Sequence, residues 1–233
     1  MTTMVKNWHE LWDGGKYKTA EDDLSLRALL DLDALYSVTE GAWQEYVRDV
    51  INKLGNTNRK AVLLEIGCGA GAFLRVTESW YDNQWGVDFS ARQIEVCRQA
   101  LPVGNFTVCE ACDINLETGF FDIVISTGVF SYFPNLDYTR IVLNKMLELL
   151  KEEGAGAVLD VTDIKSKDAY LSAKLNAVGE EAFSQLPPQT YYSKEVFVEF
   201  TETNGLTYRI EPQTIANYSN TPFRFNFFFW KGK

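Results

Sequence analysis

The sequence predicts a doubly wound α/β fold, in which helices cover both faces of a mostly parallel sheet. Short apolar stretches typical of buried strands alternate with helical stretches from residue 61 onward, at the spacing of β-α-β units. A glycine-rich turn follows the first of these strands, as in many sheets of this class. The last two apolar stretches, 206–211 and 223–230, are too close in sequence for a helical crossover, so we expect them to pair antiparallel.

Two helical stretches are expected to open the chain. The second has the clearer pattern, because its apolar side chains recur at the spacing of one helix face. They are Trp43, Tyr46, Val47, Val50, Ile51 and Leu54. We expect this face to be buried.

Five apolar stretches then read as strands. They cover residues 61–66, 84–88, 105–110, 120–126 and 157–161. The helices expected between them begin near Ala70, run over 90–100 with Ser90 as N-cap, and run over 136–150. Apolar positions of that last helix are Ile141, Met146, Leu147 and Leu150, and residues 152–156 are expected to end it.

A polar, helical insertion is predicted over residues 165–185, after the fifth strand, and it stops at a pair of prolines. Ser193 is expected to cap a further helix that runs to about Asn204, with Gly205 as its stop. The chain therefore reads as one domain. Its expected parts are an N-terminal helical lid (1–58), a core (60–163), a lid insertion (164–193), and a final helix with two strands (194–233).

Length and charge exclude several functional classes. A chain of 233 residues fits one large domain. The 22 Lys and Arg residues against 32 Asp and Glu give a net charge of −10 and a pI of about 4.7. Nucleic-acid binding and anionic membranes both require a basic surface. We therefore expect neither nucleic acid nor a membrane as partner, and a monomer or homodimer that binds a small molecule.

Localisation and metal content follow from other features of the sequence. No stretch has the roughly 18 apolar residues of a membrane span, and residues 1–10 lack the layout of a secretory signal, so a cytoplasmic location is expected. The four cysteines read as reduced thiols. We assign no metal to the pair Cys109 and Cys112, because zinc requires about four ligands and His9 is the single histidine.

Acidic residues mark the predicted carboxyl edge of the sheet. Glu65 precedes the glycine turn and can meet an ammonium group, while Asp88 ends the second strand and can accept both hydroxyls of a ribose. Asp113 follows the third strand, where it can accept from an exocyclic amine, with Ile114 against a purine ring. Three carboxylates suit a cationic ligand better than one with two phosphates. This ligand profile is that of S-adenosylmethionine.

The motifs that carry this profile cover about residues 60–163. They are Val62-Leu-Leu-Glu-Ile-Gly-Cys-Gly-Ala-Gly71, Gly86-Val-Asp-Phe-Ser90, Ala111-Cys-Asp-Ile114, Phe121-Asp-Ile-Val-Ile-Ser126 and Leu149-Leu-Lys-Glu-Glu-Gly154. In this order and spacing they resemble the class I S-adenosylmethionine-dependent methyltransferases. The resemblance implies the strand order 3-2-1-4-5-7-6, with the seventh strand antiparallel.

The resemblance also implies a set of cofactor-binding residues. They are Glu65, Gly67, Cys68, Gly69, Gly71, Asp88, Phe89, Asp113, Ile114, Ser126 and Thr127. The glycines would pass beside the cofactor, and Asp88 would bind its ribose. Asp113 would sit at the adenine amine, and residues 126–129 would border the methionyl part. Cys68 is interpreted as a small side chain under the turn rather than as a nucleophile.

Methyl transfer from a sulfonium is an in-line displacement, so the enzyme mainly has to hold the acceptor in place and exclude water. A dedicated base is optional, and the candidates for one are His9, Tyr17 and Tyr132. Aromatic residues crowd the predicted lid segments, which favours a small organic acceptor methylated at oxygen or nitrogen.

Two alternatives remain open at the level of sequence. One is a nicotinamide-dependent oxidoreductase, because Gly67-x-Gly69-x-x-Ala72 also fits the dinucleotide-binding form. The other is a non-catalytic subunit that binds S-adenosylmethionine and stabilises a partner.

Overall fold

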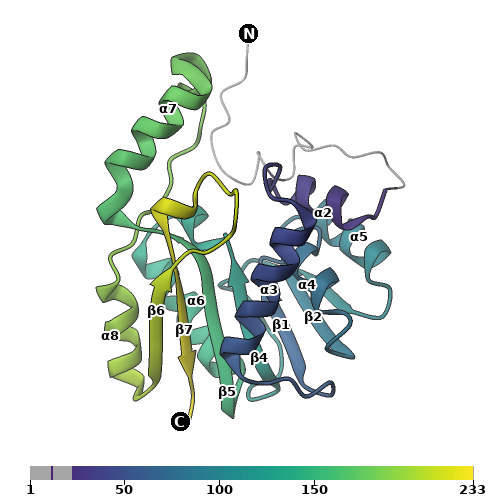
Figure 1. Cartoon of the computed structure of the whole chain (residues 1–233). Helices are drawn as coiled ribbons and strands as arrows, with labels where there is room; N and C mark the ends of the chain where they lie inside the picture. Colours follow the sequence, from purple (N-terminus) through teal and green to yellow (C-terminus); the bar gives the residue numbers. More distant parts are fainter. Residues whose placement is uncertain (1–11, 13–22, 233) are drawn as a thin grey trace.

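The computed structural model describes residue 12 and residues 23–232, which form a seven-stranded sheet with helices on both faces (Figure 1). The strands are β1 (Val62–Ile66), β2 (Asn83–Asp88), β3 (Asn105–Val108), β4 (Phe121–Thr127), β5 (Leu150–Thr162), β6 (Thr207–Pro212) and β7 (Arg224–Trp230). They lie in the order β3-β2-β1-β4-β5-β7-β6. Strand β7 runs antiparallel to both of its neighbours. The predicted fold class and topology are thereby confirmed.

One face of the sheet is covered by the first part of the chain. Its helices are α2 (Leu26–Leu32), α3 (Glu40–Leu54), α4 (Ala72–Thr77) and α5 (Ala91–Ala100). Helix α3 buries the whole predicted apolar face, and the indole N–H of Trp43 donates to the carbonyl of Ala72, 3.0 Å away. Helix α4 begins two residues later than expected, because Gly71 still has the left-handed φ of 92°.

The other face is covered by α6 (Leu136–Leu149) and α8 (Glu195–Asn204). Two details of the predicted α6 were wrong. Ile141 is half exposed, whereas Val142 and Leu143 face the core. Leu150 opens β5 instead of ending the helix, because it pairs with Phe121 and extends the sheet.

The predicted cap of α8 was also wrong. Lys194, not Ser193, is the N-cap, and the hydroxyl of Ser193 hydrogen-bonds to the carboxylate of Glu195 instead of a backbone N–H. The predicted N-cap at Ser90 and the predicted helix stop at Gly205 are confirmed.

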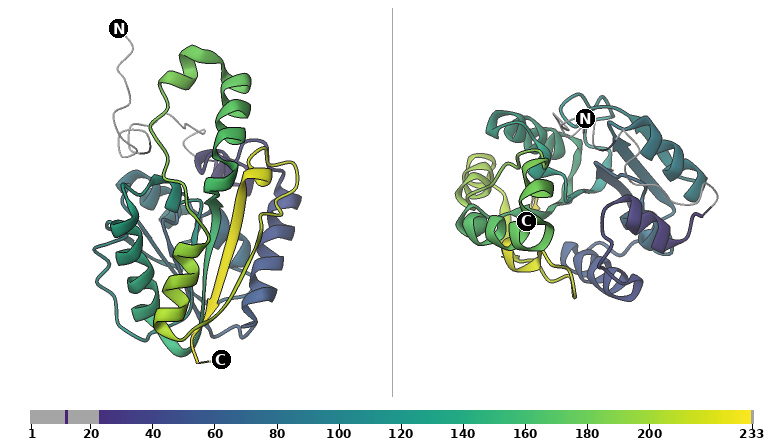
Figure 2. Two further views of the ribbon diagram at one scale, coloured as in Figure 1. Left: turned by 90° about the vertical axis from the view of Figure 1, so that its left-hand side faces the viewer. Right: turned by 90° about the horizontal axis from the view of Figure 1, so that it is seen from above.

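Helix α7 (Lys167–Ser184) is the predicted insertion, and it stands beyond the carboxyl edge of the sheet (Figure 2). It bends at Gly179, which has a φ of 79°. Tyr170 is the buried residue of this helix. Among residue 12 and residues 23–232, no helix is long and apolar enough to cross a membrane.

Candidate active site

A cavity of about 1030 Å³ lies between the carboxyl edge of the parallel strands and α7. Open α/β sheets bind their ligands at this edge. The volume is at the upper end of the range of about 300 to 1000 Å³ typical of ligand pockets. The cavity therefore has room for a cofactor together with a second small molecule.

The floor of the cavity is the glycine turn after β1. The backbone N–H groups of Gly67 and Cys68 donate to the carbonyl of Val87, at 2.7 and 3.0 Å, which binds the turn to β2. Gly67 has a φ of 72°, and a Cβ there would lie 2.3 Å from Cγ2 of Val129. Only glycine fits this close approach between the β1 and β4 ends.

Asp33, in the loop after α2, holds the same turn from the other side. Its carboxylate accepts from the backbone N–H of Ala70 at 2.8 Å and of Ala72 at 3.2 Å. Burial, opposed by these hydrogen bonds and reinforced by the charge of Asp88, raises the pKa of Asp33 to about 7. Asp33 also lines the cavity. Asp33 was not predicted from the sequence, because no local pattern indicates that a carboxylate so far away in the chain accepts hydrogen bonds from this turn.

Asp88, at the end of β2, is the third residue that holds the glycine turn in place. One carboxylate oxygen accepts from the backbone N–H of Gly69 at 2.9 Å, and the other accepts from that of Ser90 at 2.9 Å. Asp88 also lines the cavity. Its carboxylate is therefore positioned by two backbone donors at the point where the sequence predicts a ribose-binding group.

Glu65 is a buried carboxyl at the bottom of the cavity, with only 2% of its surface exposed. Its Oε2 atom has no hydrogen-bond partner within the described chain. Burial, followed by the charge of Asp33, raises the pKa of Glu65 well above its ordinary value. A cationic ligand group beside Glu65 would satisfy this oxygen and favour the carboxylate form.

Most of the predicted site residues line this one cavity. They are Glu65, Gly67, Cys68, Gly69, Asp88, Phe89, Thr127 and Tyr132. Cys68 is a buried free thiol whose pKa is raised well above the ordinary value, first by a hydrogen bond with Cys97 and then by burial. This agrees with a space-filling role under the turn.

Four predicted residues lie off the cavity lining. Gly71 caps α4, Ile114 is packed into the core, and Ser126 is fully buried within β4. Asp113 is exposed, and Glu110, three residues earlier, lines the cavity in its place. The cofactor roles of these four residues stay predictions. His9 and Tyr17 lie outside the described residues.

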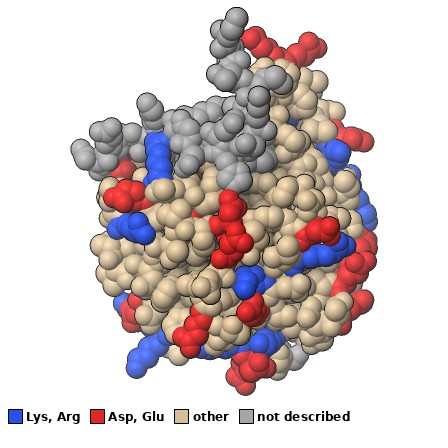
Figure 3. Space-filling model, turned by 180° about the vertical axis from the view of Figure 1, so that it is seen from behind, with Lys and Arg blue, Asp and Glu red and all other residues tan. Residues whose placement is uncertain are grey.

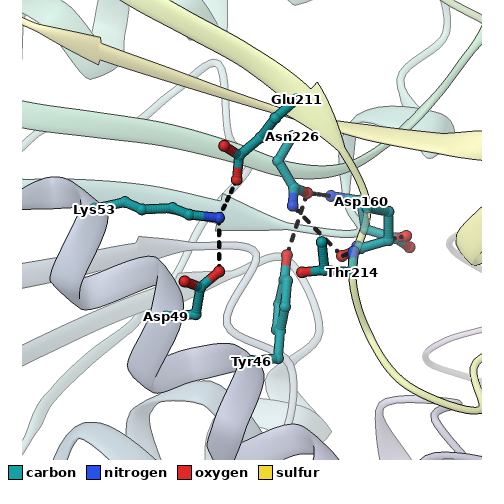
Figure 4. A network of polar contacts seen from close by, with 8 residues as sticks. Tyr46, Asp49, Lys53, Asp160, Glu211, Thr214 and Asn226 are labelled. Carbon is teal, nitrogen blue, oxygen red and sulfur yellow. Dashed lines mark hydrogen bonds and ion pairs between the residues drawn. The ribbon is translucent and has the colours of Figure 1, made fainter.

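The far end of the cavity contains polar residues that the sequence analysis missed. Asp160 interrupts the pairing of β5 with β7 and has a φ of 58°, a strained value that directs attention to function. Its carboxylate accepts from Gln213 at 3.1 Å and from Tyr218 at 3.0 Å. Its backbone N–H donates to Asn226 on β7, which also accepts from Tyr46 (Figure 4). This network holds Asp160 at the cavity wall.

Arg224, the first residue of β7, also lines the far end. Only 6% of the surface of Arg224 is exposed, and its guanidinium carbon lies 5.2 Å from the ring centre of Tyr170 on α7. Arg224 could not be predicted as a cavity residue, because an arginine at the edge of an aromatic strand is usually interpreted as a surface residue.

Comparison with known proteins indicates which protein family the residues around this cavity belong to. Residues 64–158, from β1 into β5, match the family model described as a methyltransferase domain. This segment is a methyltransferase domain. It contains the glycine turn, Asp88 and the end of β4 described above.

Proteins similar to this methyltransferase domain include large synthetases. The chain is 32% identical over 125 residues to the probable nonribosomal peptide synthetase CymA of Salinispora arenicola. This match covers 51% of the chain but only 2% of that protein. The chain thus spans a small fraction of the curated relative that it matches.

Solved methyltransferases have the same fold over most of their length. Geranyl diphosphate C-methyltransferase from Streptomyces coelicolor A3(2) has a TM-score of 0.63 and 14% identity, with 96% of both chains covered. The amino pentose methyltransferase CalS10 from Micromonospora echinaspora has a TM-score of 0.63 and 12% identity, covering 81% of this chain and 91% of its own. At such identities the likeness shows the fold alone.

The residues of the cavity fit the cofactor of this family. S-adenosylmethionine carries a sulfonium and an ammonium group, and the unsatisfied oxygen of Glu65 is a buried acceptor for a cation. Asp88 and Glu110 add two further acidic groups to the same wall. A diphosphate would meet repulsion from all three.

Proposed function

We propose that the protein transfers a methyl group from S-adenosylmethionine to an oxygen or nitrogen atom of a small-molecule acceptor. The observation that carries this proposal is the cavity itself, which is acidic at the β1 and β2 ends and aromatic beneath α7. The acidic end suits the cationic donor, and the aromatic end suits an organic acceptor.

The donor supplies an electrophilic methyl group on sulfur, and the chain's own residues supply its surroundings. Glu65 and Asp88 would hold the ammonium and ribose groups at opposite ends of the glycine turn. Val129, packed against Gly67, would fix the end of β4 beside the reacting centre. Helix α7 would exclude water, so that catalysis rests on positioning and desolvation.

Where the acceptor must lose a proton before methylation, a residue that lines the cavity would accept that proton. Tyr132 lines the cavity after β4, and its ring packs 5.7 Å from that of Trp12. Tyr132 therefore remains a candidate base within the described chain, beside His9 and Tyr17. A carboxylate acceptor would need no base, because it is already nucleophilic.

A small-molecule acceptor is favoured over a nucleic acid. The face in Figure 3 carries Asp and Glu interspersed with Lys and Arg, rather than a field of positive charge, and the whole chain has a net charge of −10. Phosphate backbones bind to continuous basic surfaces. We further propose a cytoplasmic protein of small-molecule metabolism that acts as a monomer or homodimer.

The experiment that tests this function has two parts. Calorimetry with S-adenosylhomocysteine and with NADH separates a methyltransferase from the nicotinamide-dependent alternative, and we expect only the first to bind. Release of S-adenosylhomocysteine on incubation with a metabolite panel then separates an enzyme from a non-catalytic binding subunit. Tight binding of NADH, or donor binding with no turnover on any metabolite, contradicts the proposal.

A further inference from the structure

The far end of the cavity contains a buried cation with unused donors. Nε and Nη1 of Arg224 are both buried, and neither has a hydrogen-bond partner within the described chain. The nearby carboxylate of Asp160 instead accepts from Gln213 and Tyr218. Buried N–H groups of a charged side chain are normally paired, because leaving them unpaired is costly. The two unpaired nitrogens of Arg224 therefore indicate that a ligand binds there.

The position of Arg224 separates it from the donor site. It pairs with Thr162 at the end of β5, and β5 lies beyond β4 in the sheet. The glycine turn, Glu65 and Asp88 belong to β1 and β2, on the opposite side of β4. A group bound to Arg224 thus lies on the acceptor side of the β4 end.

The donor geometry of Arg224 selects the chemistry of that group. Nη1 shares the outer edge of the planar guanidinium with Nη2, and the parallel N–H groups on that edge match the two oxygens of one carboxylate. Lys167 and Lys174, on the cavity side of α7, add positive charge to the same end. A carboxylate there would be both hydrogen-bonded and neutralised.

The walls around Arg224 define the rest of the ligand. Tyr170 covers the guanidinium and packs on Phe223 at 5.6 Å and on Tyr191 at 6.2 Å between ring centres. Leu171 of α7 lines the cavity next to it. These side chains form an apolar, mostly aromatic lining that offers area for a hydrophobic body.

We infer that the acceptor is a small carboxylic acid with an apolar body, anchored by its carboxylate to the guanidinium of Arg224. The inference rests on the proposed methyltransferase function and names the substrate class of the same cavity. The anchored carboxylate fixes one end of the acceptor, and the atom to be methylated lies toward the β4 end. Arg224 is thus assigned to substrate binding and specificity.

The test uses the full chain saturated with S-adenosylhomocysteine. Calorimetry measures the binding of phenyl-substituted carboxylic acids of increasing chain length, from benzoate to 4-phenylbutanoate, and of the primary amide of each. Phenyl phosphate is included to distinguish a phosphate from a carboxylate ligand. We expect at least one acid to bind tenfold or more tightly than its amide and than phenyl phosphate.

Variants then connect that preference to Arg224. Arg224→Gln should remove the preference for the acid. Arg224→Lys should weaken that preference at least fivefold, because lysine keeps the positive charge but lacks the parallel N–H groups of the guanidinium. Arg209→Gln, on an exposed position of the neighbouring β6, is the matched control and should leave binding unchanged. Binding of S-adenosylhomocysteine should stay within twofold in all three variants, which also shows that they fold.

Several results would overturn the inference. They are equal or absent binding of every acid and amide, a preference for phenyl phosphate, and an acid preference that survives Arg224→Gln. A loss of S-adenosylhomocysteine binding in both Arg224 variants would place Arg224 in the donor site instead. Failure of the proposed function looks different, because the wild-type protein would then not bind S-adenosylhomocysteine at all.

Discussion

The carboxylate of Asp33 lies 2.8 Å from the backbone nitrogen of Ala70 and accepts its hydrogen bond. This contact joins the loop after α2 to the turn that forms the floor of the cavity. A Cβ on Gly69 would lie 2.3 Å from the same carboxylate oxygen, so the two segments are in close contact. The N-terminal helices therefore help to shape the donor site as well as to cover the sheet.

Replacing Asp33 by Asn should loosen the turn. One amide oxygen can still accept from Ala70, but the NH₂ group would face the N–H of Ala72 as a second donor. We expect the affinity for S-adenosylmethionine to fall by about 1–3 kcal/mol, the scale of an unsatisfied buried donor. Calorimetry measures this, and Asp31→Asn, within helix α2, serves as the control. An unchanged affinity in Asp33→Asn would show that the cap does not shape the site.

The raised pKa of Asp33 predicts that stability falls as pH rises. An unfolded aspartate has a pKa of about 3.9, whereas that of Asp33 is raised to about 7. Between these values the folded state binds more protons than the unfolded state, so the free energy of unfolding decreases with increasing pH. Glu65 contributes with the same sign. Denaturant melts of the wild type from pH 4.5 to 8 should show the decrease, and Asp33→Asn should show a shallower one. A wild-type stability that rises over this range contradicts the assignment.

Asp88→Ala should weaken cofactor binding by at least ~1.5 kcal/mol, the scale of hydrogen bonds to charged groups. The substitution removes the acceptor for the ribose and also releases the N–H groups of Gly69 and Ser90. Asp82→Ala, just before the other end of β2, removes an exposed ion pair with Arg59. That control should leave calorimetric affinity unchanged. Wild-type affinity in Asp88→Ala would remove Asp88 from the ribose site.

Two glycine substitutions separate backbone strain from steric clash. Gly67 and Gly119 both have positive φ values, 72° and 67°, and an alanine in this conformation costs about 1–2 kcal/mol. A Cβ on Gly119 meets nothing within 4 Å, whereas one on Gly67 meets Val129 at 2.3 Å. Gly67→Ala should therefore lower the free energy of unfolding by a further ~1–3 kcal/mol. Equal losses in the two variants would mean that Val129 moves aside freely.

Tyr132→Phe tests the proposed base. Loss of general base catalysis should lower kcat by about 10²-fold or more, with the affinity for S-adenosylhomocysteine unchanged. The measurement is the rate of methyl transfer to an acceptor with an ionisable hydroxyl or amine. Unchanged turnover would show that Tyr132 is only part of the wall.

The elements that could be predicted from sequence are those with strong local patterns. The strand β1 with its glycine turn, the apolar face of α3 and the N-cap at Ser90 each depend on residues close together in the chain. Leu150 was misassigned because an apolar residue after a helix fits either the helix or the next strand. Ser193 was misassigned because a serine before a helix can also bond to a nearby side chain.

The donor end of the site could be predicted better than the acceptor end. Glu65 lies within β1 and Asp88 ends β2, both next to the glycine turn, so their positions are set by short segments. Asp33, Asp160 and Arg224 reach the cavity through long-range packing, and Asp160 depends on a strained interruption of β5. No periodicity in the sequence marks such positions.

A crystal structure with S-adenosylhomocysteine bound tests the central claim most directly. The account predicts density in the cavity along the glycine turn, with the amino group beside Oε2 of Glu65, the ribose hydroxyls on Asp88, and the sulfur near Thr127. Density at another place on the molecule, or an empty cavity at saturating concentration, would contradict it.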